Sequence, residues 1–488
     1  MIPSVTPPST TAPTATPFNL RFIWLISLVA AMGGLLFGYD WVVIGGAKPF
    51  FEKYFQLSSG ATEGWANSCA LLGCLLGSLI SGALSDRFGR KKLLIMSAIL
   101  FAVSSLLTGW SFSFNAFVFW RIAGGIAIGA ASNLSPMYIA EVAPASMRGR
   151  LVSINQLTIV IGILLAQIVN LLIAHKVQDS ATAEAIRISW NGQFGWRWMF
   201  SAVAVPSIVF FIGAVLIPES PRWLIKSGMT EKARAILARI GGQCYADDEV
   251  QNALATLGQE EVSHVHFRNL LEPRLLRILL IGCALAVLQQ WSGINVIFNY
   301  AEEVFRDAGY GVSSILFNIV ITGVVMLLFT LVAVRTVDRL GRRFLMLIGC
   351  AGISIFHFLI GSAYHFHFKG LVVVIPVLGA IACYSFSLAP VTWVLISEIF
   401  PNRIRGAAVS VAVSSLWIAC FILTYTFPVL DRALGPADTF WLYSAICAAG
   451  FVFILLRVPE TKGKTLEQIE MELVDEHGPR YHAQCPIE

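Results

Sequence analysis

Twelve long apolar segments constrain the fold of this chain more than any other sequence feature. An α-helix needs about 20 predominantly apolar residues to cross a bilayer. Segments of that kind occupy residues 22–47, 64–84, 93–111, 115–140, 152–174, 197–217, 275–298, 314–336, 344–364, 370–396, 408–430 and 438–457. Only 13% of the 488 residues are charged, whereas soluble domains carry about 25%. We therefore predict an all-α membrane protein with twelve transmembrane helices.

Polar stretches divide these helices into two sets of six. Residues 1–20 are rich in Pro, Thr and Ser and contain few large apolar side chains, which predicts a disordered N-terminal tail. The rest of the predicted organisation is an N-terminal six-helix half at 21–217, a cytoplasmic linker with short helices at 218–274, a C-terminal six-helix half at 275–457 and a cytoplasmic tail at 458–488.

Lysine and arginine are concentrated in alternate loops, most densely at residues 87–92 and 335–343. Cytoplasmic loops carry such an excess, so both termini are predicted to be cytoplasmic. The same clusters account for the net charge of +5, and no nucleic-acid partner is implied. The nine cysteines are scattered, mostly inside apolar segments, and form neither a CxxC motif nor a Cys/His cluster. We therefore predict no metal site and no cofactor.

Two polar motifs occur twice in the chain. Asp86-Arg87-Phe88-Gly89-Arg90-Lys91 returns as Asp338-Arg339-Leu340-Gly341-Arg342-Arg343, and Glu141 with Arg148-Gly149 returns as Glu398 with Arg405-Gly406. Both motifs repeat at nearly the same distance, which indicates two homologous halves. In transporters built this way, the substrate binds between the halves near the middle of the membrane.

One carboxylate lies inside the first apolar segment. A charge at the bilayer centre costs roughly 2.5 to 3.5 kcal/mol on insertion scales, so Asp40 needs a reason to be there. Arg121, the basic residue of the fourth segment, is the expected partner. A structural ion pair is one interpretation. We favour a proton switch, in which a change in separation from the arginine lets the carboxylate take up a proton.

Amide and aromatic side chains suggest a binding site for a neutral polyol. Gln156, Gln289, Gln290 and Asn295 both donate and accept hydrogen bonds, as sugar hydroxyls require. Such amides can also join helices to each other, but Gly293 could break its helix and re-aim Asn295. The aromatic candidates to face a sugar ring are Phe37, Trp393 beside Pro390, and Trp417. Packing within the bundle is the alternative for each.

Charged side chains gather at the predicted cytoplasmic helix ends. Ion pairs between the halves there could hold one face shut and break as it opens. Topology alone needs only Lys or Arg, so acidic partners at repeated spacings favour a latch. The residues concerned are Asp86, Arg87, Arg90, Glu141, Arg148, Asp338, Arg339, Arg342, Glu398 and Arg405.

Together, these motifs resemble the sugar porter family of the major facilitator superfamily. The similarity spans residues 22 to 470 and adds Gly38-Tyr39-Asp40, Pro218–Leu224, Gln289-Gln290 with Gly293–Asn295, and Pro459–Gly463. Within the family, the pattern is most similar to bacterial proton-coupled xylose symporters. The resemblance implies a major facilitator fold and alternating-access symport of a monosaccharide, or a related polyol, with a proton. It also implies that Asn299 faces the sugar and that Glu219, Arg222 and Glu460 belong to the cytoplasmic latch.

Several pocket positions depart from the xylose symporter pattern. Asn299 replaces the first residue of a tyrosine pair, Met326 and Leu416 replace amides, and Ala389 replaces glycine. Glu302 replaces a proline just beyond. The resemblance thus implies fewer hydrogen bonds on the C-terminal side of the site. A differently oriented hexose, a deoxy sugar or a cyclitol would fit this less polar wall.

Other functions fit the sequence less well than symport. An uncoupled sugar facilitator would not need Asp40 with Arg121, and a nontransporting sugar sensor would have a longer tail than 458–488. The Gly-Pro-rich fifth helix of drug-proton antiporters is absent. An enzyme is not expected, because the chain contains no HExxH motif and no phosphate loop. We expect a multi-pass protein of the plasma membrane, the inner membrane if bacterial, that works as a monomer in the lipid bilayer.

Overall fold

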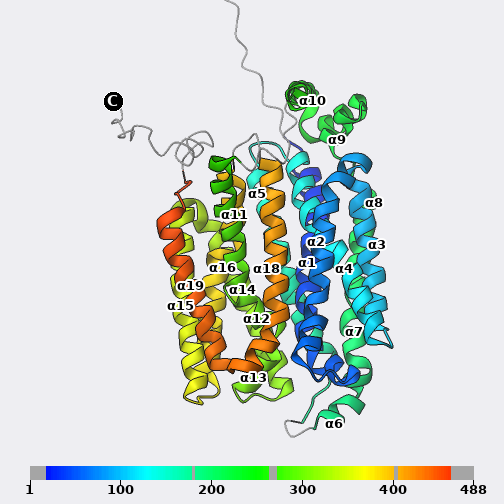
Figure 1. Cartoon of the computed structure of the whole chain (residues 1–488). Helices are drawn as coiled ribbons and strands as arrows, with labels where there is room; N and C mark the ends of the chain where they lie inside the picture. The colour runs from blue at the N-terminus through cyan, green and yellow to red at the C-terminus, as the bar shows by residue number, and fades with distance from the viewer. Residues whose placement is uncertain (1–17, 179–181, 263–271, 401–404, 463–488) are drawn as a thin grey trace, which may run out of the picture.

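The computed structural model describes residues 18–178, 182–262, 272–400 and 405–462. Most of its described residues are helical, and there is no strand among them. Twelve segments within them are long and apolar enough to cross a membrane, and they stand side by side in one bundle (Figure 1). The predicted all-α membrane fold is confirmed.

Six spans precede the linker, and we call them the N-terminal half. They are α1 (Leu20–Phe55), α2 (Gly60–Phe88), α3 (Arg90–Gly109), α4 (Phe114–Val142), α5 (Arg148–Ile173) and a sixth span made of η1 (Asn191–Gly195), α7 (Trp196–Ser201) and α8 (Ala204–Leu216). Short α6 (Ala183–Ile188) lies outside the bundle at one end (Figure 1).

Six further spans follow the linker and form the C-terminal half. They are α11 (Pro273–Trp291) with α12 (Ile294–Asn299), α14 (Val312–Leu340), α15 (Arg342–His365), α16 (Leu371–Phe386) with α17 (Leu388–Ile399), α18 (Arg405–Leu434) and α19 (Pro436–Arg457). Short α13 (Ala301–Asp307) continues from α12.

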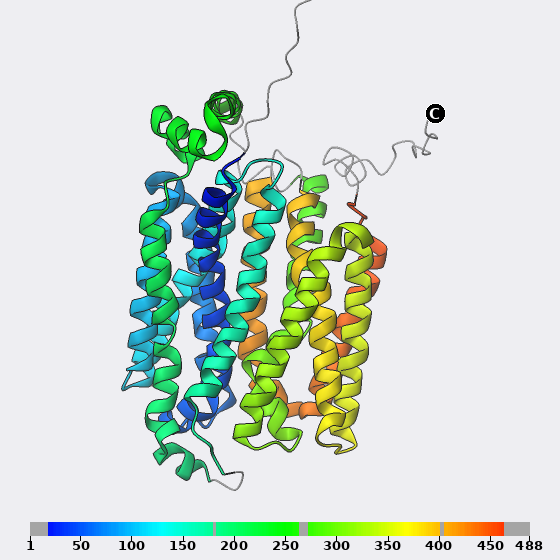
Figure 2. The same ribbon diagram turned by 180° about the vertical axis from the view of Figure 1, so that it is seen from behind.

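The linker helices α9 (Pro221–Lys226) and α10 (Thr230–Val262) lie beyond the N-terminal half, at the end of the bundle opposite α6 and α13 (Figures 1 and 2). Short helices were predicted in this linker. The structure contains α9 and the longer α10, which is kinked at Gly242, whose φ is 84°. The predicted terminal tails lie almost entirely outside the described residues.

The predicted spans agree with the helices to within a few residues, except for the first. Helix α1 continues to Phe55 rather than ending at residue 47. The added turns contain Lys48 and Glu52, which are buried. Ion pairing between these side chains keeps the segment helical and packed where an isolated charge would favour water.

Glycines allow the closest helix contacts in the N-terminal half. A Cβ atom on Gly38 of α1 would lie 1.9 Å from the carbonyl oxygen of Ile159 in α5. On α4, a Cβ atom on Gly125 would lie 1.9 Å from the carbonyl oxygen of Ala70 in α2. Membrane helices associate largely through such close packing, because lipid is as apolar as their side chains.

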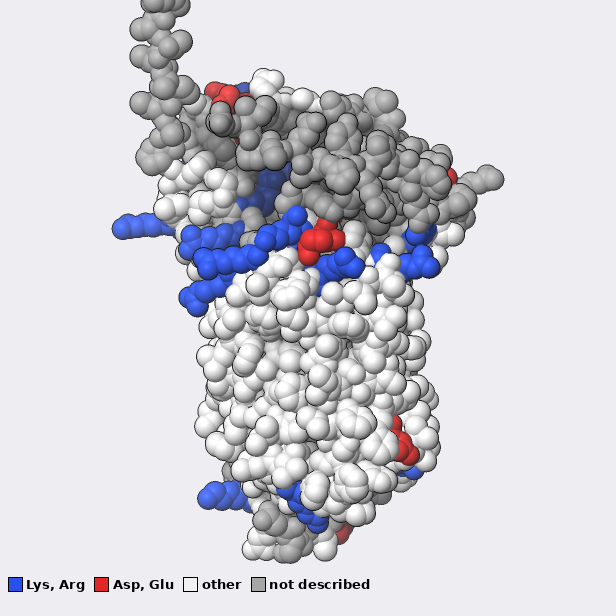
Figure 3. All heavy atoms as spheres, turned by 90° about the vertical axis from the view of Figure 1, so that its left-hand side faces the viewer, with Lys and Arg blue, Asp and Glu red and all other residues white. Residues whose placement is uncertain are grey.

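The outer surface has the charge pattern of a membrane protein. On the face shown in Figure 3, a broad band without charged side chains separates a belt of Lys and Arg near the linker end from a few charges at the other end. That band provides the apolar surface that lipid requires.

Candidate functional site

Asp40 and Arg121 meet inside the N-terminal half. Oδ2 of Asp40 on α1 accepts a hydrogen bond from Nη1 of Arg121 on α4 at 2.9 Å, and each residue is only 4% exposed. The guanidinium also lies 5.4 Å from the ring centre of Phe200. A buried pair of this kind is strongly destabilised when one partner loses its charge alone. The pairing expected from the sequence is therefore present.

A helix break lies where Gly293 predicted one. Helix α11 ends at Trp291, Gly293 has φ of 82°, and α12 begins at Ile294. A left-handed conformation suits glycine, which has no Cβ atom to clash. The carbonyl oxygen of Ser292, freed by the break, is held by Nε2 of His357 on α15 at 2.8 Å.

Three of the four predicted amides gather around this break. Nδ2 of Asn295 donates to Oε1 of Gln290, and Nε2 of Gln290 lies 3.4 Å from Oε1 of Gln289. All three are buried. Gln289 also reaches the carbonyl oxygens of Leu388 and Ala389, each at 3.4 Å, at the start of α17. The fourth amide, Gln156 on α5, is half-buried and is not part of the hydrogen bonds named here.

An aromatic cluster joins the two halves next to the ion pair. The ring of Trp417 on α18 lies 5.9 Å from that of Phe37 and 6.1 Å from that of Trp41, both on α1. Phe37 and Trp41 meet edge to face at 5.8 Å. Trp41 was not predicted from the sequence. Its position directly after Asp40 and one turn after Phe37 could have indicated that it lies beside both.

Trp393 lies apart from this cluster. Its side chain is 36% exposed, and the ring contacts just described do not include it. The tenth span breaks at Ser387, between α16 and α17 and three residues before Pro390. Proline removes the hydrogen bond to the residue four positions earlier and crowds its carbonyl group, so the distortion falls one turn before it.

Asn299 lies near Arg121 and belongs to the C-terminal half. It is buried at the end of α12, and its Oδ1 has no hydrogen-bond partner among the described residues. Asn299, Trp41, Asn67 and Arg121 share the lining of one small cavity between the halves. The three apolar replacements, Met326, Ala389 and Leu416, are buried as well.

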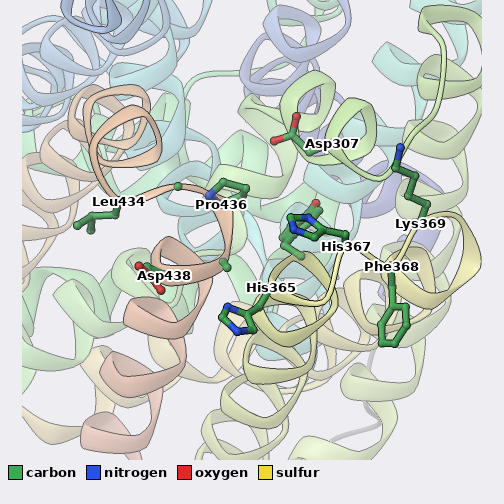
Figure 4. A pocket seen from close by; sticks show the side chains of 11 residues that line it. Asp307, His365, His367, Phe368, Lys369, Leu434, Pro436 and Asp438 are labelled. Atoms are coloured by element: carbon green, nitrogen blue, oxygen red, sulfur yellow. The ribbon is translucent and has the colours of Figure 1, made fainter.

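A larger pocket of about 450 Å³ lies elsewhere, at the end of the C-terminal half opposite the linker. Asp307, His367 and Lys369 lie along its border (Figure 4). None of the predicted site residues lines it.

Each repeated motif builds the same structure at the linker end. In the N-terminal half, Oε1 of Glu219 accepts from the backbone nitrogens of Arg90 and Lys91 at 2.9 and 3.0 Å, which caps α3. The Arg90 side chain pairs with Glu141 at 2.9 Å and with Asp86 at 3.0 Å. Asp86 also pairs with Lys226 of α9 at 3.1 Å.

The C-terminal half repeats this arrangement. Glu460 accepts from the backbone nitrogens of Arg342 and Arg343 at 2.9 and 3.1 Å, which caps α15. Arg342 pairs with Glu398 at 3.3 Å. Glu219 and Glu460, assigned to the gate by resemblance alone, thus have matching structural roles at helix N-termini, where carboxylates are favoured.

These ion pairs do not form the latch that was expected between the halves. Each ion pair named at the linker end joins residues of one half, or a half and the linker. Arg87, Arg148, Arg222 and Arg339 are exposed at that end. The side chains of Asp338 and Arg405 lie outside the described residues.

Comparison with known proteins places this chain in a family. The model of the family described as "Sugar (and other) transporter" matches residues 26–473. The chain belongs to this sugar transporter family. It is 40% identical to an arabinose-proton symporter of Bacillus subtilis, over 94% of this chain and 96% of that protein. It is 39% identical to a D-xylose-proton symporter of Escherichia coli, over 93% and 96%.

Another relative and two solved structures extend the comparison. A glucose transport protein of Synechocystis is 42% identical over 96% of this chain and all of that protein. The inward-open xylose transporter XylE of E. coli superposes with a TM-score of 0.81 at 38% identity, covering 92% of this chain and all of that one. With 6-bromo-6-deoxy-D-glucose bound, the XylE structure gives a TM-score of 0.76 at 37% identity, over 93% and 100%. The chain is therefore a membrane transporter and not an enzyme.

Proposed function

We propose that this chain carries a monosaccharide across the membrane together with a proton, by alternating access between its two halves. The observation that carries the proposal is the buried Asp40–Arg121 pair. A carboxylate paired with a cation inside the membrane is costly to keep and serves as a proton relay in many transporters. Relatives named as arabinose-proton and xylose-proton symporters support the same function.

The geometry suggests how the two substrates are coupled. Asp40 and Trp41 are neighbours on α1, so a change at the ion pair shifts the aromatic surface that meets Trp417 of the opposite half. Proton uptake on Asp40 would release Arg121 and let α1 move against α18. Coupling then needs no long pathway, because one helix carries both the proton site and a wall of the sugar site.

The sugar is proposed to bind between the halves. Gln156, Gln289, Gln290, Asn295 and Asn299 would supply donors and acceptors to its hydroxyls. The Phe37 and Trp417 rings, with Trp393 in a second position, would contact its apolar face. Buried Met326 and Leu416 leave the C-terminal wall less polar, which favours a sugar with fewer hydroxyls on that side.

Orientation and assembly complete the proposal. The belt of Lys and Arg near the linker favours a cytoplasmic location for that end and for both termini (Figure 3). The membrane would be the inner membrane if the source is bacterial. One chain contains both halves and the whole cavity between them, so we propose that the monomer transports. The charged motifs at the linker end would close that face when the halves approach each other.

Sugar-induced alkalinisation outside weakly buffered cells tests the coupling. We expect one sugar from a panel of pentoses, hexoses and polyols to raise the external pH with the wild type. Asp40→Asn should abolish this signal and retain exchange of labelled sugar, whereas Asp40→Glu should keep both because it can still bind a proton. Surface expression is the control, since Arg121 loses its partner in Asp40→Asn. Labelled sugar that enters without any pH change in the wild type would instead identify a facilitator.

A further inference from the structure

A second buried charge cluster lies at the end of the bundle opposite the linker. Lys48 on α1 is 0% exposed. Its Nζ lies 3.1 Å from Oε1 of Glu52, one turn further along α1, and 3.9 Å from Oε2 of Glu302 on α13. It also pairs with Glu303 on α13. The ion pairs with α13 join the N-terminal half to the C-terminal half.

Further contacts surround this cluster. The Lys48 ammonium lies 5.2 Å from the ring centre of Tyr300, which precedes α13. Arg306 pairs with Glu302 at 3.3 Å from the opposite, half-exposed side. A second ion pair between the halves, Glu63 of α2 with Arg432 of α18, lies at the same end. The other charged groups whose electric fields act on the cluster are Lys53 of α1, Asp307 of α13 and Asp431 of α18.

The cluster holds more carboxylates than cations. Glu52, Glu302 and Glu303 have oxygens within 4.8 Å of one another, and they face two cations, Lys48 and Arg306. Glu303 Oε2 is buried without a hydrogen-bond partner in the described part of the chain. Three carboxylates that close together cannot all stay ionised away from water unless each is compensated. Burial raises the pKa of Glu302, although Lys48 opposes the shift.

We propose that Lys48, Glu52, Glu302 and Glu303 form an outer latch, which clamps α1 to α13 on the extracellular side and traps one external proton among its three carboxylates when it closes. The location rests on the orientation and alternating access proposed above. The latch explains why Glu302 replaces proline at this position: it supplies the third carboxylate. The TM-score of 0.81 with the inward-open XylE structure agrees with a closed outer side.

The direction of the pH effect on the latch, and the side to which the proton returns, both follow from this arrangement. The carboxylates hold it more tightly in the closed, buried latch than in the open, hydrated one, so a low external pH stabilises the closed latch and a rising pH weakens it. The latch opens only toward the outside, so the proton returns to the side from which it came. It therefore alters how external pH sets the outward-facing population, without adding to the protons moved per sugar.

Cysteine labelling of intact cells tests the latch without requiring transport. Asn67 on α2 and the native Cys74 are both buried in the cavity between the halves. In a Cys74→Ser background, Asn67→Cys should therefore react with a membrane-impermeant maleimide only when the outer side opens. We expect Lys48→Met to label several-fold faster than the parent. Lys48→Glu with Glu303→Lys keeps the charge count and should return to the parent rate. Lys176→Met removes an exposed charge beyond the end of α5, at the same end of the bundle but outside the cluster, and should leave the rate unchanged.

The same reporter tests the trapped proton. Between pH 8 and pH 6, labelling in the parent should fall relative to that in a Glu302→Gln background measured at the same pH, because that variant lacks the excess carboxylate. Comparison at equal pH cancels the reactivity of the thiol itself. An unchanged rate in Lys48→Met, or no recovery in the charge-exchanged variant, would overturn the latch. If the ratio of parent to Glu302→Gln labelling stays constant with pH, the proposal of a trapped proton is wrong. Neither result depends on whether sugar transport is proton-coupled.

Discussion

Trp417 combines an aromatic contact with an unused donor. It is 2% exposed between Phe37 and Trp41, and its Nε1 has no hydrogen-bond partner among the described residues. A buried donor left unpaired is costly, and a sugar hydroxyl could satisfy it. We expect Trp417→Phe, which keeps an aromatic ring but loses the N–H group, to raise the KM for sugar by about 2- to 10-fold.

Uptake of labelled sugar measures this effect. Trp110→Phe is the matched control, because Trp110 is 39% exposed at the end of α3 and packs on Trp198. Its KM should not change. An equal KM for Trp417→Phe and the wild type would show that the indole N–H does not contact the sugar.

Among single residues, the sequence predicted those whose type is unusual for their surroundings. Asp40, Arg121 and the amides near Gly293 are polar groups inside apolar helices, and the structure buries them. It did not predict Trp41, because an aromatic residue in a membrane helix is ordinary. Lys48 was missed for a different reason. It stood at the edge of an apolar segment, where a charge normally marks the start of a loop, and its partners on α13 are distant in sequence.

Among the elements, the broken span α11–α12 depends most on one backbone position. Gly293 has φ of 82°, and a Cβ atom there would lie 2.8 Å from the Tyr443 ring. Left-handed geometry costs other residues roughly 1 to 2 kcal/mol, and the contact with Tyr443 adds to that. We expect Gly293→Ala to lower sugar uptake strongly, because Asn295 and Asn299 would lose their positions.

A second glycine variant separates the effect of backbone strain from the effect of displaced side chains. Gly435 has a similar φ of 84° with open space around it, although its ψ of 164° differs from the −7° of Gly293, so Gly435→Ala tests strain at a positive φ without the clash. Uptake per molecule at the cell surface should fall much further for Gly293→Ala than for Gly435→Ala. Adding Tyr443→Leu to Gly293→Ala should recover part of the loss. Equal effects of both glycine variants would argue against a role for the break.

Element boundaries were predictable to the extent that apolar length decides them. Eleven of the spans follow the apolar segments, but α1 extends to Phe55 because charges on two helices neutralise each other. The break of the tenth span at Ser387 could have been predicted from Pro390, because proline disturbs a helix about one turn before itself.

For the whole molecule, the repeat was the most informative signal, because matching motifs predicted matching local structures in both halves. Glu219 caps α3 and Glu460 caps α15 in the same way. Which ion pairs link the halves could not be predicted, since that depends on how far apart the two linker-side faces stand. The same sequence must form one set of contacts with the outer side closed and another with the inner side closed.

Orientation is the remaining property of the whole molecule, and one cysteine can report it. Cys244 on α10 is exposed, whereas the other described cysteines are buried or half-buried. In a Cys485→Ser background, a membrane-impermeant maleimide should leave intact cells unlabelled and should label Cys244 once the membrane is permeabilised, because the basic belt holds the linker in the cytoplasm. Cys244→Ser should abolish the signal in permeabilised cells. Labelling of Cys244 in intact cells would reverse the orientation, place the outer latch on the cytoplasmic side, and make the internal pH the variable that it senses.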